Sequence, residues 1–127
     1  NNGSVQEVPR MQHHEVAVAL QEALIYLSCG HPEGFGLPLA EAIACGCMVV
    51  GYHGLAGRDF ALPHMKVVEF GDLLGLLQGI KSELARFDAN REKVIQERLE
   101  ASRLILQRYS LEEEQVCCLR TWSQLCP

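Results

Sequence analysis

Residues 24–51 read LIYLSCGHPEGFGLPLAEAIACGCMVVG, and the order of elements in this stretch decides the fold. Leu24–Leu27 is a short apolar run with β-branched and aromatic members, which predicts a buried strand, and Met48–Val50 predicts the next one. Pro38 suits the first turn of a helix, where its missing N–H costs nothing. Gly46 then supplies a stop at the end of that helix. The stretch therefore predicts the strand, loop, helix and strand of a parallel α/β unit.

The segments on both sides continue this alternation. Apolar residues recur at helical spacing in residues 13–23, and residues 5–8 are expected to form a short strand that ends at Pro9. Residues 66–70 predict a third strand. The remainder is predicted to be helical, with apolar stripes in residues 73–84, 94–106 and 110–125. We therefore expect an α/β fold with a Rossmann-like parallel sheet and flanking helices.

Two loops of unusual composition each follow a predicted strand. The first runs from Ser28 to Gly36, and the second, Gly51–Gly57, is rich in glycine. Right-handed crossovers bring the loops after parallel strands to the same edge of the sheet. Ligands of open α/β sheets bind at this carboxyl edge, so both loops are candidates for a binding site.

Composition narrows the class of protein. The chain has 127 residues, enough for one compact domain, and 48% of them are hydrophobic. The net charge of −5 gives no electrostatic footprint for nucleic acid, so no nucleic-acid partner is expected. No apolar run is long enough for a transmembrane segment. The N-terminus has neither an initiator Met nor a signal-peptide pattern, and we expect the chain to be part of a longer reading frame.

The six cysteines do not predict a metal site or a disulfide framework. No pair has the spacing of a zinc site, and Cys45 and Cys47 alone would chelate poorly. Free thiols imply a reducing compartment, so we expect a cytoplasmic location, with peripheral association with a membrane left open. His31 and His53 fall in the two candidate loops, where either could contact a phosphate or a sugar.

The chemistry of the first loop begins with its glycines. Gly34 and Gly36 flank Phe35, and two glycines so close to a helix start let the backbone approach a ligand closely. The helix that follows offers unpaired N–H groups and the positive end of its dipole, which attract phosphates or sugar hydroxyls. These features predict a ligand site at the start of this helix.

Two carboxylates accompany this helix start. Glu33 lies in the loop before it, and Glu41 is placed on the helical wheel roughly opposite Leu39 and Ile43, which can therefore be buried. Carboxylates are good acceptors for the hydroxyl groups of a ribose or a hexose. Each acid alone is explained more simply as a surface residue near a helix dipole. Their combination with the glycines and the end of a strand favours the ligand site.

Residues 32–50 resemble the signature of the group 1 retaining glycosyl transferases of the GT-B fold. In that signature, EGFGLP-x-x-EA-x-A-x-G-x-x-VV, a Glu is followed by seven residues and a second Glu. The resemblance implies that residues 1–127 form a single nucleotide-sugar-binding domain, the C-terminal half of a two-domain GT-B enzyme. It also implies a hexosyl transfer to a hydroxyl acceptor, a nucleotide-sugar donor as substrate, and no metal or other cofactor.

The resemblance assigns roles to individual residues. Glu33 would be the catalytic-site acid that contacts the hydroxyls of the donor sugar near the reacting carbon, and Glu41 would bind the ribose. The substrate-binding backbone that lines the sugar and diphosphate would be that of Gly34, Phe35, Gly36 and Leu37. The second loop matches less well, because the family often has Gly-Gly followed by Glu where this chain reads GLAGRD over residues 54–59.

Two parts of the family's catalytic apparatus are expected upstream of this chain. They are the Arg and Lys that neutralise the diphosphate and the N-terminal acceptor domain. We therefore expect the isolated chain to be inactive. Val116 and Trp122 of the last helix are expected to be packing residues, and in an intact enzyme this helix is expected to lean on the missing domain. In the isolated chain its apolar face would be exposed and promote self-association. Two alternatives stay open: a non-catalytic binding or interaction module of the same fold, and an unrelated phosphate-binding domain such as half of a sugar-nucleotide epimerase.

Overall fold

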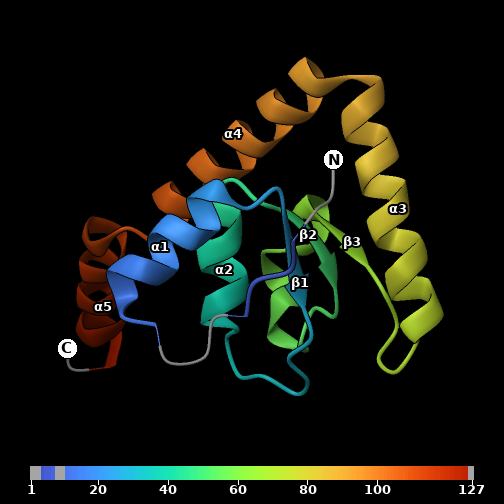
Figure 1. The fold of residues 1–127 in the computed structure, drawn as a ribbon. Coiled ribbons are helices and arrows are strands. Elements are labelled where there is room, and N and C mark those ends of the chain that lie inside the picture. Colours follow the sequence, from blue (N-terminus) through green and yellow to red (C-terminus); the bar gives the residue numbers. More distant parts are fainter. Residues whose placement is uncertain (1–3, 8–10, 126–127) are drawn as a thin grey trace.

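A computed structural model describes residues 4–7 and 11–125 of the chain. The chain forms an α/β fold with a small parallel sheet between helices, as the alternation predicted (Figure 1). In chain order the principal elements are α1 (His13–Glu22), β1 (Ile25–Ser28), α2 (Leu37–Ala44), β2 (Met48–Gly51), β3 (Met65–Val67), α3 (Leu73–Ala89), α4 (Arg91–Arg108) and α5 (Leu111–Leu125). Two 3-10 helices, η1 (Ala56–Asp59) and η2 (Leu62–His64), connect β2 to β3.

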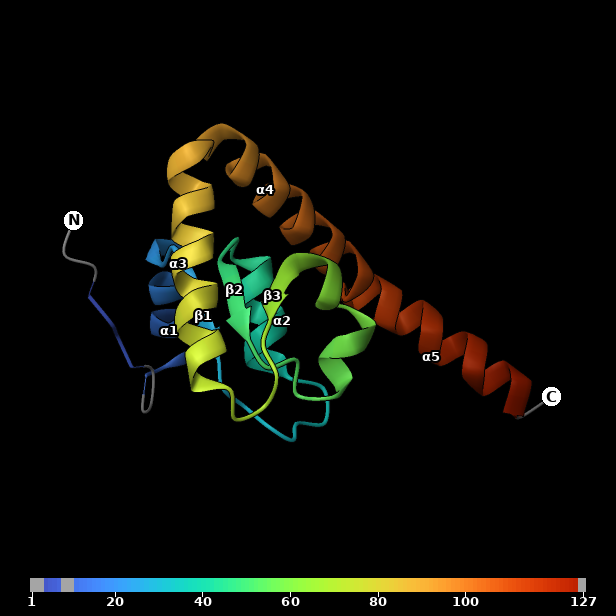
Figure 2. The ribbon, with the colours of Figure 1, turned by 90° about the vertical axis from the view of Figure 1, so that its right-hand side faces the viewer.

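The sheet has three parallel strands in the order β1-β2-β3. Tyr26 lies beside Val49 and Leu27 lies beside Val50 in the register of the first pair. Alternation along the strands sends Tyr26 and Val49 to one face and Leu27 and Val50 to the other. The first face packs against α1, α2 and α4, and the second packs against α3 (Figures 1 and 2).

The core is built from these two faces. On the first face, Ile43 of α2 and Val49 are almost fully buried. On the second face, Val50 packs with Val68 and with Ile80 of α3. Each fully buried aliphatic side chain of this kind contributes roughly 1.5–3 kcal/mol by leaving water. The helix α2 is thus fixed against the sheet, and its start at Leu37 is placed at the carboxyl edge.

The third strand is shorter than predicted. Residues 66–70 were expected to be extended, but β3 covers Met65–Val67. Val68 still donates its N–H to Gly51 O, at 2.9 Å, and then the chain turns, with Asp72 N–H bonded to Glu69 O at 3.0 Å. Phe70 consequently lies in a turn rather than in the sheet. This turn ends the strand and brings Asp72 to the start of α3, where its side chain caps the helix.

The expectation of a short strand over residues 5–8 is not met by residues 5–7, which form no regular element, and residues 8 and 9 lie outside the described part of the chain.

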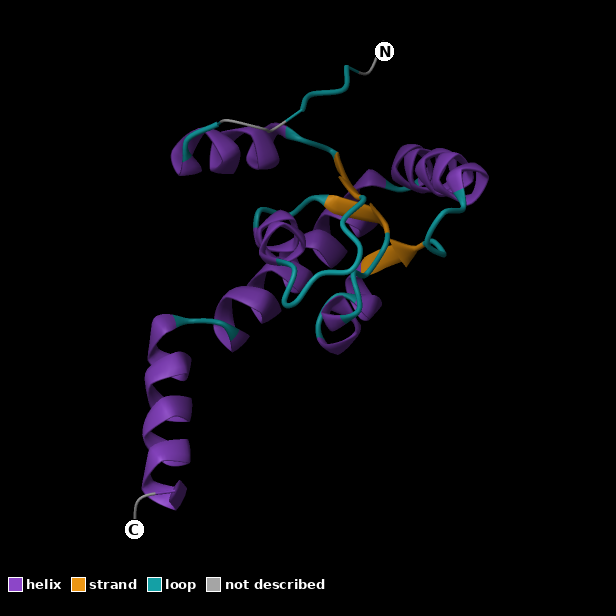
Figure 3. Cartoon of the chain, turned by 90° about the horizontal axis from the view of Figure 1, so that it is seen from below, coloured by secondary structure: helices purple, strands orange, loops and turns teal. Residues whose placement is uncertain are grey.

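The last helix, α5, stands apart from the rest of the fold. It projects from the body of the domain (Figures 2 and 3), and none of its described residues is buried. Ser110 caps its start, since the Glu113 N–H donates to the Ser110 hydroxyl oxygen at 3.1 Å. This is the half of a capping box in which the serine accepts.

Candidate functional site

The carboxyl ends of β1 and β2 are locked together directly below the candidate loops. The Ser28 hydroxyl donates to Tyr52 O at 2.7 Å, and the Tyr52 N–H donates to Ser28 O at 2.8 Å. Gly51 adopts φ 135°, and a Cβ there would meet Ser28 O at 2.1 Å. Only glycine permits this close approach of the two backbones.

The two loops predicted to share an edge touch each other. The Glu33 N–H donates to Gly54 O at 2.9 Å, and Glu33 forms a parallel bridge with Leu55. Gly54 takes φ 65°, and a Cβ on it would lie 3.2 Å from the Glu33 Cβ. Glu33 is therefore held by its backbone at the junction of the two loops.

The Glu33 side chain lies among the glycines of its own loop. A Cβ on Gly30 would fall 1.9 Å from one carboxylate oxygen of Glu33, and a Cβ on Gly36 would fall 3.1 Å from the other. Gly36 has φ 81° as the N-cap of α2. The absence of side chains at these two glycines thus leaves the space that the half-buried carboxylate occupies.

The start of α2 presents free backbone donors. Within residues 4–7 and 11–125, the N–H groups of Gly34, Phe35, Gly36 and Leu37 donate to no protein acceptor. Pro38 follows at the second helical position, and the first bonds of the helix run from the N–H groups of Leu39 and Ala40 to Gly36 O, at 3.0 and 3.1 Å. Consecutive free N–H groups at the positive end of a helix dipole form an arrangement that binds anions.

Glu41 lies on the exposed side of α2, while Leu39 and Ile43 are buried as the helical wheel predicted. The charges of Glu33 and Glu41 both affect Tyr26 of β1. Its pKa is raised by burial first, and also by the negative charges of Glu33 and Glu41. Both carboxylates therefore act on one tyrosine. We call the region formed by residues 28–37, residues 51–58, Glu41 and Tyr26 the glycine-rich corner.

The Phe35 side chain takes part in packing rather than pointing into open solvent. Its ring stacks on Phe60, with centroids 5.0 Å apart, and meets the edge of Tyr109 at 5.1 Å. Arg108 approaches the same cluster and donates to Asp59 O at 2.9 Å. This aromatic anchor fixes the loop between Glu33 and α2, and it leaves the backbone of Phe35 available.

The second loop has a strained residue at its centre. Leu55 adopts φ 83° and ψ −66°, a tight turn that costs roughly 1–3 kcal/mol for a residue with a side chain. The resemblance places a second glycine here, and the chain keeps a glycine-like conformation with leucine. The Leu55 N–H donates to His53 Nδ1 at 3.1 Å. His53 Nδ1 therefore accepts a hydrogen bond from the turn that it precedes.

Arg58 brings a cation to this loop. Its Nε donates to His53 Nε2 at 3.4 Å, which is long for a hydrogen bond. No carboxylate pairs with Arg58 among the described residues. On the other side of the first loop, His31 stacks on Phe70 with centroids 4.3 Å apart. The histidines thus support the two loops by packing and hydrogen bonding.

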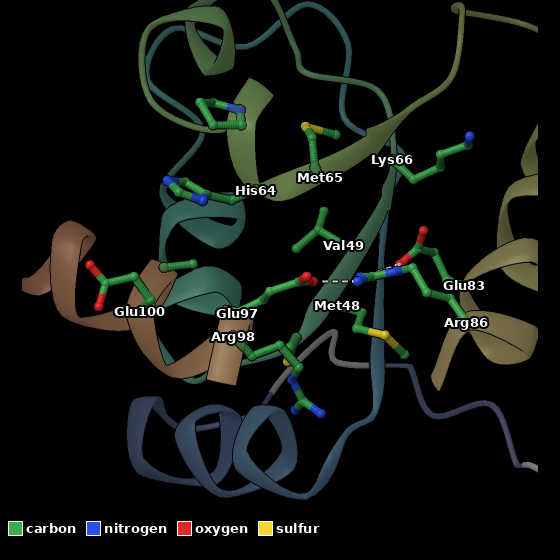
Figure 4. Close-up of a pocket in the computed structure, with 13 residues that line it drawn as sticks. Met48, Val49, His64, Met65, Lys66, Glu83, Arg86, Glu97, Arg98 and Glu100 are labelled. Atoms are coloured by element: carbon green, nitrogen blue, oxygen red, sulfur yellow. Dashed lines mark hydrogen bonds and ion pairs between the residues drawn. The ribbon is translucent and has the colours of Figure 1, made fainter. Parts of the chain in front are cut away.

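Two hollows lie outside the glycine-rich corner. A cavity of about 400 Å³ lies at the amino ends of β2 and β3, the edge opposite the candidate site. Figure 4 shows Arg86 of α3 lying between Glu83 and Glu97 on its wall, so these charges are paired. A groove of about 1030 Å³ lies between α4, η1 and α5, with Phe35 and Leu37 on its rim.

Several classes of site are not seen in the part of the chain that the structure describes. No three His, Cys, Asp or Glu side chains converge there as a metal site requires. None of the described helices has the length and apolar character needed to cross a membrane. The five described cysteines are free thiols, and Cys126 lies outside the described residues.

The sequence of this region was compared with known protein families. Residues 1–61 match the family model of the group 1 glycosyl transferases. The match includes α1, β1, α2, β2 and η1, and therefore both candidate loops. It supports a glycosyl transferase function for this chain. No curated protein and no solved structure gives a significant match.

Sequence reasoning missed three contributors to this corner. Tyr26 was assigned only to a buried strand, although period-2 alternation places it on the face of α2. Gly30 was placed only within the loop from Ser28 to Gly36, and its proximity to Glu33 depends on how the loop folds back. Arg58 could have been noticed as the cation next to the glycine-rich loop.

Proposed function

We propose that this corner is the donor site of a retaining glycosyl transferase of the GT-B fold, and that it binds a nucleoside-diphosphate hexose. The observation that carries the proposal is the run of free N–H groups at Gly34–Leu37, bordered by Glu33 and Glu41. These donors suit the oxygens of a diphosphate, and carboxylates on either side suit the hydroxyls of two sugars. The family match over residues 1–61 supports the same chemistry.

Each group has a distinct role in this proposal. Glu33 accepts hydrogen bonds from the hydroxyls of the hexose near its anomeric carbon. The backbone of residues 34–37 binds the diphosphate and stabilises it as it leaves. Glu41 accepts hydrogen bonds from the ribose hydroxyls. Arg58, which no described carboxylate neutralises, adds positive potential at the same edge.

Sugar transfer needs two further components. The leaving diphosphate requires strong electrostatic stabilisation, and the acceptor hydroxyl has to be held close to the anomeric carbon. We propose that a second domain provides the acceptor site and additional cations. The 127-residue chain is then expected to bind the donor without transferring its sugar, and measurable transfer by this chain alone would contradict this division of labour.

The direct test is calorimetric titration of the chain with UDP-, GDP- and ADP-hexoses. One of these donors is expected to bind, and Glu41→Ala is expected to weaken its binding by about 1–3 kcal/mol through the loss of hydrogen bonds to a charged acceptor. Glu22→Ala is the matched control, because Glu22 is an exposed carboxylate at the end of α1. A folded sample that binds no nucleotide sugar, or a Glu41→Ala variant with unchanged affinity, would contradict the assignment.

A further inference from the structure

Phe70 is an exposed aromatic residue at the carboxyl edge of the sheet. It lies in the turn between β3 and α3, and Figures 1 and 2 show this turn at the same edge as the loop that follows β1. Its side chain is 64% exposed, although Val68, two residues earlier, is buried. Most of the ring is therefore free to contact a ligand at this edge.

Two aromatic neighbours hold the Phe70 ring in place. His31 of the first loop stacks on it, with centroids 4.3 Å apart and the ring planes at 26°. The buried Tyr52 meets it at 5.3 Å, with the planes at 69°. Tyr52 is itself fixed, because its N–H donates to Ser28 O and its carbonyl oxygen accepts from the Ser28 hydroxyl. We call the stacked rings of His31 and Phe70 the aromatic platform.

The aromatic platform lies next to the Glu33 carboxylate. A Cβ on Gly30 would fall 1.9 Å from one oxygen of this carboxylate, so the Glu33 side chain folds back against the residue that precedes His31. The free N–H groups of residues 34–37 follow Glu33 on its other side along the chain. Glu33 is therefore placed between the backbone donors at the start of α2 and the aromatic platform.

We propose that the aromatic platform binds the hexose of the nucleotide sugar, a role that rests on the proposed function of the glycine-rich corner. A hexopyranose carries hydroxyl groups around its rim and C–H groups on its two faces. Carboxylate oxygens accept hydrogen bonds from the hydroxyls. The C–H groups carry a small positive charge and are attracted to the negative face of an aromatic ring. Glu33 and the platform supply these two kinds of contact side by side.

This arrangement binds the two parts of the donor through different groups. The backbone of residues 34–37 and Glu41 bind the nucleoside diphosphate, and the platform contacts the hexose alone. Sites for small ligands commonly combine aromatic walls with a few polar groups that fix the orientation of the ligand. Loss of the aromatic face should therefore weaken the binding of the nucleotide sugar and leave that of the nucleoside diphosphate unchanged.

Calorimetric titration of the 127-residue chain with paired ligands tests the platform. The probes are UDP-glucose, GDP-mannose and ADP-glucose, each compared with its nucleoside diphosphate. Phe70→Leu keeps an apolar side chain without an aromatic face. It should raise the ratio of the dissociation constant of the nucleotide sugar to that of the nucleoside diphosphate by about threefold to tenfold. Phe70→Tyr keeps the aromatic face and should leave this ratio unchanged.

Phe87→Leu is the matched control for the same replacement. Phe87 lies near the end of α3, next to residues that line the cavity at the opposite edge of the sheet, and its ring is covered by Arg91. This variant should leave the ratio of dissociation constants unchanged. Because Phe70 is mostly exposed, Phe70→Leu should also keep its thermal unfolding transition.

The outcomes separate this proposal from the donor site itself. A ring that only held the first loop in place would affect both ligands equally, so an unchanged ratio in Phe70→Leu would overturn the platform. The same conclusion would follow if Phe70→Tyr or Phe87→Leu raised the ratio as much, or if a nucleoside diphosphate bound and none of the nucleotide sugars did. A folded chain that binds none of these ligands would overturn the donor site, and the platform with it.

Discussion

At the scale of single residues, two glycines shape the candidate site in different ways. Gly51 allows two backbones to approach, since a Cβ there would meet the main-chain oxygen of Ser28 at 2.1 Å. Gly30 instead leaves room for a side chain, because its missing Cβ lies where the Glu33 carboxylate sits. Replacement of the two glycines should therefore have different consequences for stability and for ligand binding.

Gly51→Ala is expected to lower the free energy of unfolding by roughly 2–4 kcal/mol, because the residue adopts φ 135° and its neighbour is backbone that cannot move aside. Gly30→Ala should lower it by less than about 1 kcal/mol, because only the flexible end of Glu33 has to shift. That shift should still weaken donor binding. Urea unfolding and calorimetry of both variants provide the check, and equal loss of stability would refute the distinction.

At the scale of elements, each helix start in the second half of the chain is fixed by a polar side chain. Asp72 accepts from the Gly75 N–H at 2.8 Å at the start of α3, and Asn90 accepts from the Lys93 N–H at 3.1 Å at the start of α4. Asn90 also ends α3, so one residue separates two long helices. These caps explain why β3 is short, since the chain has to turn before Asp72.

Asp72→Ala should lower the free energy of unfolding by about 1 kcal/mol through the loss of this N-cap bond, and Asp72→Asn should recover most of the loss. Asp88→Ala is the control on the same helix. It removes a carboxylate that is 74% exposed and lies 3.8 Å from Arg91, a surface pair of little worth. Urea unfolding curves would contradict the capping role if the two alanine variants behaved alike.

At the scale of the whole molecule, α4 holds the helices of the first face to the sheet. Its Arg98 and Ser102 donate to the backbone oxygens of Gly46 and Ala44 at the end of α2, and so satisfy carbonyls that a helix end leaves unpaired. Arg86 of α3 pairs with Glu97 of α4 near the same amino end of β2. The start of α2 is thus positioned by contacts at its far end.

Cys47 offers a probe of this global packing. It is buried beside α1, its thiol donates to Leu20 O at 3.0 Å, and burial raises its pKa from about 9 to about 11. The folded state therefore keeps the thiol protonated where the unfolded chain would ionise, so this contribution to stability is complete below pH 9 and is lost as the pH rises towards 11. Unfolding curves between these pH values should show a decline, which Cys47→Ala should reduce.

Alkylation followed by mass spectrometry gives a second measurement. Cys29, Cys117 and Cys118 are exposed and should react rapidly in the folded chain, whereas Cys47 should react only in denaturant. Reaction of Cys47 at the rate of the exposed thiols would contradict the packing described for α1 and β2.

The sequence alone determined the order of strands and helices around residues 24–51, the sharing of one edge by both loops, and the burial of Leu39 and Ile43 opposite Glu41. These features follow from local periodicity, from Pro38 and Gly46, and from the handedness of parallel crossovers, all of which act over short distances. Only the tertiary structure decided that Glu33 lies between glycines, that Leu55 bridges to it in a strained turn, and that Tyr26 is near both acids. Those relations join residues on different elements, and their geometry depends on how the packed core brings the elements together. The exposed leucines and Trp122 of α5 belong to both: their spacing is local, but their exposure is visible only in the folded chain.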